Sequence, residues 1–198
     1  FFGWVWAIGK KASDDHIACI HDIHDKALQP LVGEVELPPG AVGTYEQRPF
    51  SVGQSINDLA RRAKNQDRRI VSWSTHEMIK IAESELSPSL LRMFEHNYRD
   101  GKVTAKKWFK QLDLDTAKGT NTLVRYLEQA RYPLPDTYGL GQTTKRLKSV
   151  LSGIENKGSW SQLLSSQQKN WVGLLVHNFA DCHGLRHVSK TATAALNP

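Results

Sequence analysis

The hydrophobic pattern of this chain changes from strand-like to helical partway along its length. Residues 1–9 are rich in aromatic and β-branched side chains, as buried strands are, and residues 16–20 form a second apolar run of strand length. Beyond residue 50, apolar side chains recur at helical intervals, interrupted by one strand-like run at 69–74. Leading strands followed mainly by helices predict an α/β fold, in which a sheet is covered by helices.

The remaining elements are expected from local signals. Residues 31–37 are a candidate third strand, because Pro38-Pro39-Gly40 breaks regular structure directly after them. Helices are expected to start at Ser51, Thr75 and Ser87. Further helical stripes lie at 105–112, 123–130, 147–154, 171–175 and 185–188. The 198 residues contain no internal repeat and no long linker, so we expect one domain over residues 1–198.

Positive charge predominates in the chain. Lys and Arg outnumber Asp and Glu by 26 to 20, and the pI is about 9.3. This excess favours a polyanionic partner, and the cations cluster at 61–69, 99–110 and 145–148. The candidate nucleic-acid contacts in these groups are Lys106, Lys107, Lys145 and Arg146. A solvated basic surface without a partner is the alternative.

Composition also bears on the cellular location of the protein. No apolar run reaches membrane-spanning length, which predicts no membrane partner. The only cysteines are Cys19 and Cys182, and nothing requires them to pair, so we expect a reducing, cytoplasmic location. The chain begins at Phe1 without a Met and is apolar from the start, which indicates a missing upstream segment or membership of a larger protein.

The segment 174–185 carries the most specific candidate chemistry. His177 and Asp181 are four residues apart, so their side chains meet on one face of a helix. A carboxylate can hold a divalent cation, and an imidazole one turn away can orient or deprotonate a water molecule. The alternative is an ion pair on the surface of an amphipathic helix.

A second candidate lies where the strand-like run at 69–74 gives way to a helix. Glu77 falls in the first turn of that helix, just past the end of the strand. Ligand sites of α/β sheets gather at such strand ends. A Glu in this position also complements the helix dipole without any catalytic role.

Together these segments resemble the DEDD, or DnaQ-like, exonuclease group of the ribonuclease H-like superfamily, and within it the predicted-ribonuclease branch. The resemblance runs from about residue 54 to residue 189. It covers residues 69–77, 97–100, 122–127, 147–150 and 174–185. Its most specific part is the Asn178…Asp181…Leu185 pattern. The resemblance implies a mixed central sheet flanked by helices.

The activity implied by the resemblance is two-metal phosphodiester hydrolysis. Four acidic groups would bind two Mg²⁺ or Mn²⁺ ions, which activate water and stabilise charge on phosphate oxygens. Glu77 would be the acid of the second motif and Asp181 the acid of the third. His177 stands where the family often has a tyrosine and would orient the attacking water. Asp100 is an outer candidate ligand.

The first acidic motif of the family is not found. It consists of an aspartate and a glutamate two residues apart on the first strand. If residues 1–9 were that strand, Gly3 and Val5 would stand in place of the acids; if they are the second strand, the first lies upstream. Asp22 and Asp25 are candidate substitutes, but their spacing does not place them on the same face of a strand.

Two further patterns are less specific. His21-Asp22 resembles the dyad of metal-dependent phosphohydrolases, but it ends a strand-like run, whereas those proteins are helical. His183 and His187, next to Cys182, have the spacing to grip zinc, but no second ligand pair is evident.

The tryptophans have mainly a structural interpretation. Trp4, Trp6, Trp108 and Trp171 lie in apolar patterns and are expected in the core. Trp73 lies beside the candidate site, where it either stacks on a base or belongs to the core.

Three hypotheses follow for the function. The first is a metal-dependent nuclease that acts on DNA or RNA. The second is a nucleic-acid-binding domain of the same fold that has lost catalysis, and it predicts salt-sensitive binding without cleavage. The third is a structural domain that docks onto a larger protein through an exposed apolar surface.

Overall fold

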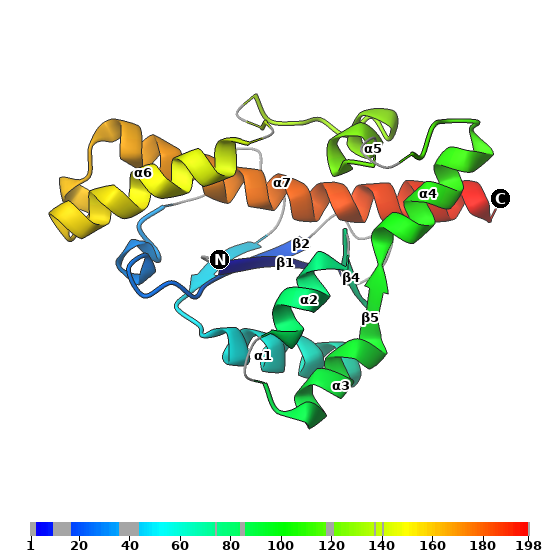
Figure 1. Cartoon of the computed structure of the whole chain (residues 1–198), viewed down its shortest axis with the longest axis horizontal. Helices are drawn as coiled ribbons and strands as arrows, with labels where there is room; N and C mark the ends of the chain where they lie inside the picture. Colours follow the sequence, from blue (N-terminus) through cyan, green and yellow to red (C-terminus); the bar gives the residue numbers. More distant parts are fainter. Residues whose placement is uncertain are drawn as a thin grey trace. The chain divides into compact units, whose positions relative to one another are not determined.

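A computed structural model of the chain describes both strands and helices (Figure 1). The described residues are 3–9, 17–35, 44–73, 75–83, 86–117, 121–136, 138–139 and 141–197. The mixture of strands and helices confirms the α/β prediction at this coarse level. The chain divides into two compact units: unit 1 is Phe1–Ser51 with Leu134–His183, and unit 2 is Val52–Pro133 with Gly184–Pro198.

Unit 1 contains a three-stranded sheet in the order β1-β2-β3. The strands are β1 (Gly3–Gly9), β2 (Ile17–Ile23) and β3 (Thr44–Arg48). β1 pairs with β2 antiparallel, with Gly3 opposite Ile23, and β2 pairs with β3 parallel, with Ala18 opposite Thr44. The two leading strands predicted from the sequence are therefore confirmed.

The prediction of a third strand over residues 31–37 is wrong where the structure describes it. A 3-10 helix, η1 (Gln29–Leu31), ends at Leu31, and Gly33 follows at φ +83° in a turn. Leu31 is fully buried in the core, so its apolar character reflects packing and not strand pairing. Residues 36 and 37 lie outside the described residues. The third strand is instead β3, whose polar sequence gave no clear strand pattern.

Helices complete unit 1. They are α6 (Gln142–Lys157), the 3-10 helix η2 (Trp160–Gln162) and the first part of α7 (Ser165–Leu196). α6 lies along this part of α7 (Figure 1), and the Gln167 side chain donates to the Ser149 carbonyl at 3.2 Å. The core of unit 1 combines Ile23, Leu28, Leu31, Val150, Ile154, Leu163, Trp171, Leu174 and Leu175. Trp171 is thus in the core, as predicted, whereas the side chains of Trp4 and Trp6 lie outside the described residues.

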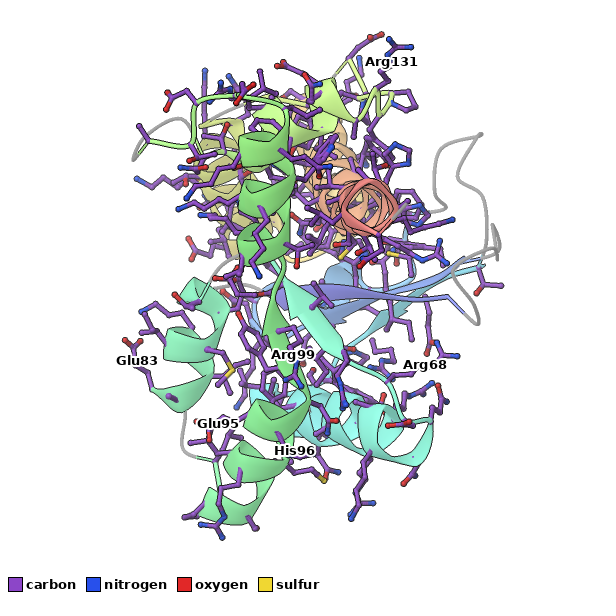
Figure 2. All side chains as sticks on the ribbon, turned by 90° about the vertical axis from the view of Figure 1, so that its right-hand side faces the viewer. Arg68, Glu83, Glu95, His96, Arg99 and Arg131 are labelled. Carbon is purple, nitrogen blue, oxygen red and sulfur yellow. The ribbon has the colours of Figure 1, made fainter. Side chains whose placement is uncertain are left out.

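Unit 2 combines two short parallel strands with several helices. Its elements are α1 (Val52–Asn65), β4 (Ile70–Ser72), α2 (His76–Ala82), α3 (Pro88–Asn97), β5 (Tyr98–Asp100), α4 (Gly101–Gln111), α5 (Leu123–Gln129) and the last part of α7. β4 and β5 are parallel, with Ser72 opposite Asp100. α1 packs against α3, whose exposed side includes Glu95 and His96 and continues to Arg99 (Figure 2). Trp108 is buried, as predicted.

The last two predicted helices are one helix. α7 runs without interruption over 32 residues, so the prediction of separate helices around 171–175 and 185–188 is wrong. Gly184 lies inside this helix and allows close packing, because a Cβ atom there would lie 2.4 Å from Leu127 Cδ2. Among the described helices, none is long and apolar enough to cross a membrane.

Candidate functional site

Two acidic side chains flank the carboxyl ends of β4 and β5 in unit 2. The chain leaves β4 at Ser72 and enters α2, and it leaves β5 at Asp100 and enters α4 directly. In the first turn of α2, Glu77 Oε2 accepts a hydrogen bond from the Ser72 hydroxyl at 3.3 Å. Asp100 caps α4, since its Oδ1 accepts from the Lys102 backbone N–H at 2.8 Å. The parallel pairing therefore brings both acids to one edge of the two strands.

The Tyr98 hydroxyl interacts electrostatically with both Glu77 and Asp100. It forms a hydrogen bond with the Ser72 hydroxyl. Burial raises the pKa of Tyr98, the Ser72 hydrogen bond partly opposes this, and the charges of Glu77 and Asp100 raise the pKa further. We call these four residues, Ser72, Glu77, Tyr98 and Asp100, the acidic edge.

Gly101 allows α4 to start close to β4. An added Cβ atom would lie 2.9 Å from the Ser72 carbonyl oxygen and 3.0 Å from Leu185 Cδ1. Because one of these neighbours is backbone, a larger residue would displace either the start of α4 or the end of β4. The geometry of the acidic edge depends on this glycine.

Trp73 follows Ser72 and is half-buried. Its ring meets Tyr126 edge on, with centroids 5.0 Å apart, and the Lys102 ammonium lies 5.5 Å from its centroid. Trp73 therefore packs against its neighbours in unit 2 without being fully buried. Base stacking by Trp73 stays a prediction. The α4 helix continues from Lys102 to the half-buried Lys106 and the exposed Lys107.

A second group, in unit 1, joins the predicted His177–Asp181 pair to a tyrosine. The two side chains do meet on one face of α7: His177 Nε2 lies 3.5 Å from Asp181 Oδ2. The Tyr138 hydroxyl donates to Asp181 Oδ1, and the Tyr138 ring stacks on the His177 ring with centroids 4.3 Å apart and planes inclined by 9°. Burial raises the pKa of Asp181, and the Tyr138 hydrogen bond and His177 oppose this.

The predicted site residues are therefore distributed over both units. Glu77 and Asp100 belong to the acidic edge of unit 2, and His177 and Asp181 belong to unit 1. Tyr138 was not predicted, because it is 43 residues from Asp181 in an irregular segment, where no local pattern reports the contact.

The basic residues predicted to bind nucleic acid differ in their surroundings. Lys106 and Lys107 lie on α4 in unit 2, and Lys145 is exposed on α6 in unit 1. Arg146 is half-buried, and its Nη1 donates to the Gly173 carbonyl at 3.3 Å, which ties α6 to α7. A role in packing therefore accounts for Arg146 without a nucleic-acid ligand.

The acidic edge suits a magnesium ion by its donor chemistry. Mg²⁺ prefers oxygen ligands, and it is usually bound by one or two carboxylates together with substrate phosphates. Glu77 and Asp100 are such a pair, and both are partly accessible. Within the described part of the chain, no three His, Cys, Asp or Glu side chains gather as a metal site.

The less specific candidates from the sequence make contacts with other parts of the protein. Both carboxylate oxygens of Asp22 accept from Arg48, at 2.7 and 3.0 Å, in a buried pair, and Asp25 Oδ1 accepts from the Ala27 backbone N–H. His187 Nε2 hydrogen-bonds with the Ala130 carbonyl at 2.8 Å, and the ring of His183 stacks on Phe179. These contacts give Asp22, Asp25, His183 and His187 structural roles.

Comparison of the chain with protein-family models, with curated proteins and with solved structures finds no match.

Proposed function

We propose that the chain is a metal-dependent nuclease of the ribonuclease H-like kind, which hydrolyses phosphodiester bonds of DNA or RNA. The observation that carries the proposal is the acidic edge. Two carboxylates stand at the common carboxyl end of adjacent parallel strands, where ligands of α/β proteins bind. The basic α4 helix begins at the same edge, which favours an anionic substrate.

The proposed roles follow from the chemistry of each side chain. Bound Mg²⁺ or Mn²⁺ would supply Lewis-acid stabilisation of the phosphate charge and lower the pKa of water. Glu77 and Asp100 would hold a cation at the acidic edge, where the Ser72 hydroxyl orients Glu77. In unit 1, Asp181 would be a carboxylate ligand of a cation, and His177 would orient the attacking water.

The nucleic-acid contacts are proposed from charge and aromatic character. Lys106 and Lys107 would contact phosphates, as Lys145 would in unit 1. Trp73 would stack on a base through its accessible surface.

The test is cleavage of labelled single- and double-stranded DNA and RNA in the presence of Mn²⁺. Glu77→Gln, Asp100→Asn and Asp181→Asn each keep a hydrogen-bond acceptor and remove the charge. We expect EDTA to stop cleavage and each variant to lower it by more than about 100-fold, beyond the loss typical of residues that only support a ligand. Glu95→Gln, at an exposed position of α3 (Figure 2), is the matched control and keeps full activity.

A second candidate function is nucleic-acid binding without cleavage. It is favoured by the small number of acids that the described residues gather, because two-metal hydrolysis requires more carboxylates than the acidic edge supplies. If no substrate is cut but binding weakens with salt, this function replaces the nuclease.

A further inference from the structure

We propose that Tyr138 is a positioning residue for the His177–Asp181 pair, holding the imidazole by stacking and the carboxylate by hydrogen bonding. This inference rests on the proposed function, in which Asp181 holds a cation and His177 orients water. Tyr138, His177 and Asp181 all belong to unit 1.

The stack fixes the plane of the His177 ring. The two rings are nearly parallel, at 9°, and their centroids are 4.3 Å apart. The His177 side chain is only 13% exposed, and its Nε2 faces Asp181 Oδ2 at 3.5 Å. Its Nδ1 is buried and has no hydrogen-bond partner among the described residues. The imidazole orientation is therefore held mainly by the Tyr138 ring and by Asp181.

The hydroxyl fixes the Asp181 carboxylate. Tyr138 donates to Oδ1, while Oδ2 is the oxygen that faces His177. The side chain of Asp181 remains 38% exposed, so the carboxylate is still accessible to a cation. Outer groups that hydrogen-bond to a ligating carboxylate orient it, and their loss typically weakens metal binding or activity by about 10- to 100-fold.

Tyr138 is itself held by the backbone. Its N–H donates to the Pro135 carbonyl at 2.8 Å, which closes a turn before α6. The ring and the hydroxyl thus reach α7 from a separate segment, and each makes a distinct contact with the pair. Two substitutions can separate these contacts: Tyr138→Phe keeps the stack and removes the hydroxyl, and Tyr138→Leu removes both.

The experiment measures Mn²⁺ binding by electron paramagnetic resonance, and the His177 ring protons by NMR, in the full chain. We expect Tyr138→Phe to weaken Asp181-dependent Mn²⁺ binding by about 10- to 100-fold and to retain the ring-current shift of His177. We expect Tyr138→Leu to lose that shift as well. Added Mn²⁺ should restore cleavage by Tyr138→Phe, which a folding defect would not allow.

A double-mutant comparison isolates the contact. In an Asp181→Asn background, Tyr138→Phe should have no further effect on Mn²⁺ binding, because the coupled partner is gone. Tyr132→Phe is the matched control: Tyr132 packs against His187, another histidine of α7, and the substitution should leave Mn²⁺ binding unchanged.

The outcomes separate the two proposals. Unchanged Mn²⁺ affinity in Tyr138→Phe, or a His177 shift that survives in Tyr138→Leu, overturns the positioning role. A wild-type chain that binds Mn²⁺ through Asp181 but cuts no nucleic acid overturns the nuclease and leaves the role of Tyr138 supported. If the Asp181→Asn variant binds Mn²⁺ as tightly as the wild-type chain does, both the nuclease proposal and the role of Tyr138 are overturned.

Discussion

His21 lies in the interior of β2 with a side chain that is 1% exposed. The edge of its ring meets the Tyr45 ring, with centroids 5.2 Å apart. Both ring nitrogens are buried and have no hydrogen-bond partner within the described residues. Burial lowers the pKa of His21 from 6.5 to about 3, although the charge of Asp22 opposes this. The folded chain therefore holds this histidine neutral well below neutral pH.

This environment predicts a specific loss of stability in acid. Between pH 6.5 and about 3, the unfolded chain binds a proton at His21 and the folded chain does not. The free energy of unfolding therefore falls, by about 1.4 kcal/mol per pH unit from this group, as the pH drops through that window. We expect His21→Phe, which keeps an aromatic ring beside Tyr45, to flatten this dependence in urea unfolding measured across the window.

The control for His21 is an exposed histidine. His96 lies on the surface of α3 (Figure 2), so His96→Gln should keep the wild-type dependence of stability on pH. An unchanged slope in His21→Phe would show that the imidazole is not held neutral by burial.

Side-chain contacts could be predicted from the sequence where they are local. The His177–Asp181 contact depends only on helical spacing, and it is present. The contacts of Tyr138 with Asp181 and of Arg48 with Asp22 join residues 43 and 26 positions apart. Such contacts depend on the tertiary arrangement, which no periodicity along the chain encodes.

At the scale of elements, the junctions between strands and helices determine the acidic edge. β5 passes into α4 without a loop, and Gly101 is the first residue of the helix. A Cβ atom at this position would lie 2.9 Å from the Ser72 carbonyl oxygen, closer than real Cβ contacts. At Gly53 in α1, the nearest atom would be Leu86 Cδ2 at 3.8 Å, an ordinary contact.

The two glycines therefore predict opposite effects of alanine. Gly101→Ala should lower the free energy of unfolding by about 1–3 kcal/mol through overpacking. Gly53→Ala should raise it by about 0.5–1 kcal/mol, because alanine loses less backbone entropy in a helix. Urea unfolding measures both changes in stability, provided that each variant has the same m-value as the wild type. A Gly101→Ala variant as stable as the wild type would mean that α4 tolerates a shift away from β4.

The elements that the sequence did not predict are those with weak patterns. β5 has three residues, too few for any alternation to show, and it was therefore not predicted as a strand. β3 reads Thr-Tyr-Glu-Gln-Arg and lacks the apolar alternation of a half-buried strand. In contrast, Ser87-Pro88 predicted the start of α3 correctly, and the Ser87 hydroxyl accepts from the Leu90 N–H at 3.3 Å.

For the whole molecule, the excess of positive charge is not evenly available to a ligand. Arg62 pairs with Asp58 at 2.9 Å, and Arg69 donates to the Asn97 side chain at 3.1 Å. Arg99 donates to the carbonyls of His96 and Tyr98. These arginines have partners within unit 2, so composition alone overstates the charge that can meet phosphate. The lysines of α4 are the stronger candidates.

Salt dependence distinguishes lysines that contact phosphate from those that only add to the net charge. Each phosphate contact contributes about −0.9 to the slope of log K against log salt for duplex DNA and about −0.7 for single strands. We expect the double variant Lys106→Gln, Lys107→Gln to make the slope less steep by about 1.4 to 1.8. The control double variant combines Lys157→Gln with Lys169→Gln, at exposed positions of unit 1. Like the Lys106, Lys107 variant, it removes two positive charges from a chain whose formal net charge is +6.

The control double variant should leave the slope close to that of the wild type, because screening limits the reach of exposed charges that do not contact the ligand. Fluorescence anisotropy with a labelled oligonucleotide over a range of salt concentrations measures both variants. Equal changes in the two variants would mean that only the overall charge attracts nucleic acid. A slope that is unchanged in the Lys106, Lys107 variant would place the contacts elsewhere, with Lys145 of α6 as the next residue to test. A local effect of α4 would place phosphates beside the acidic edge, where the proposed hydrolysis requires them.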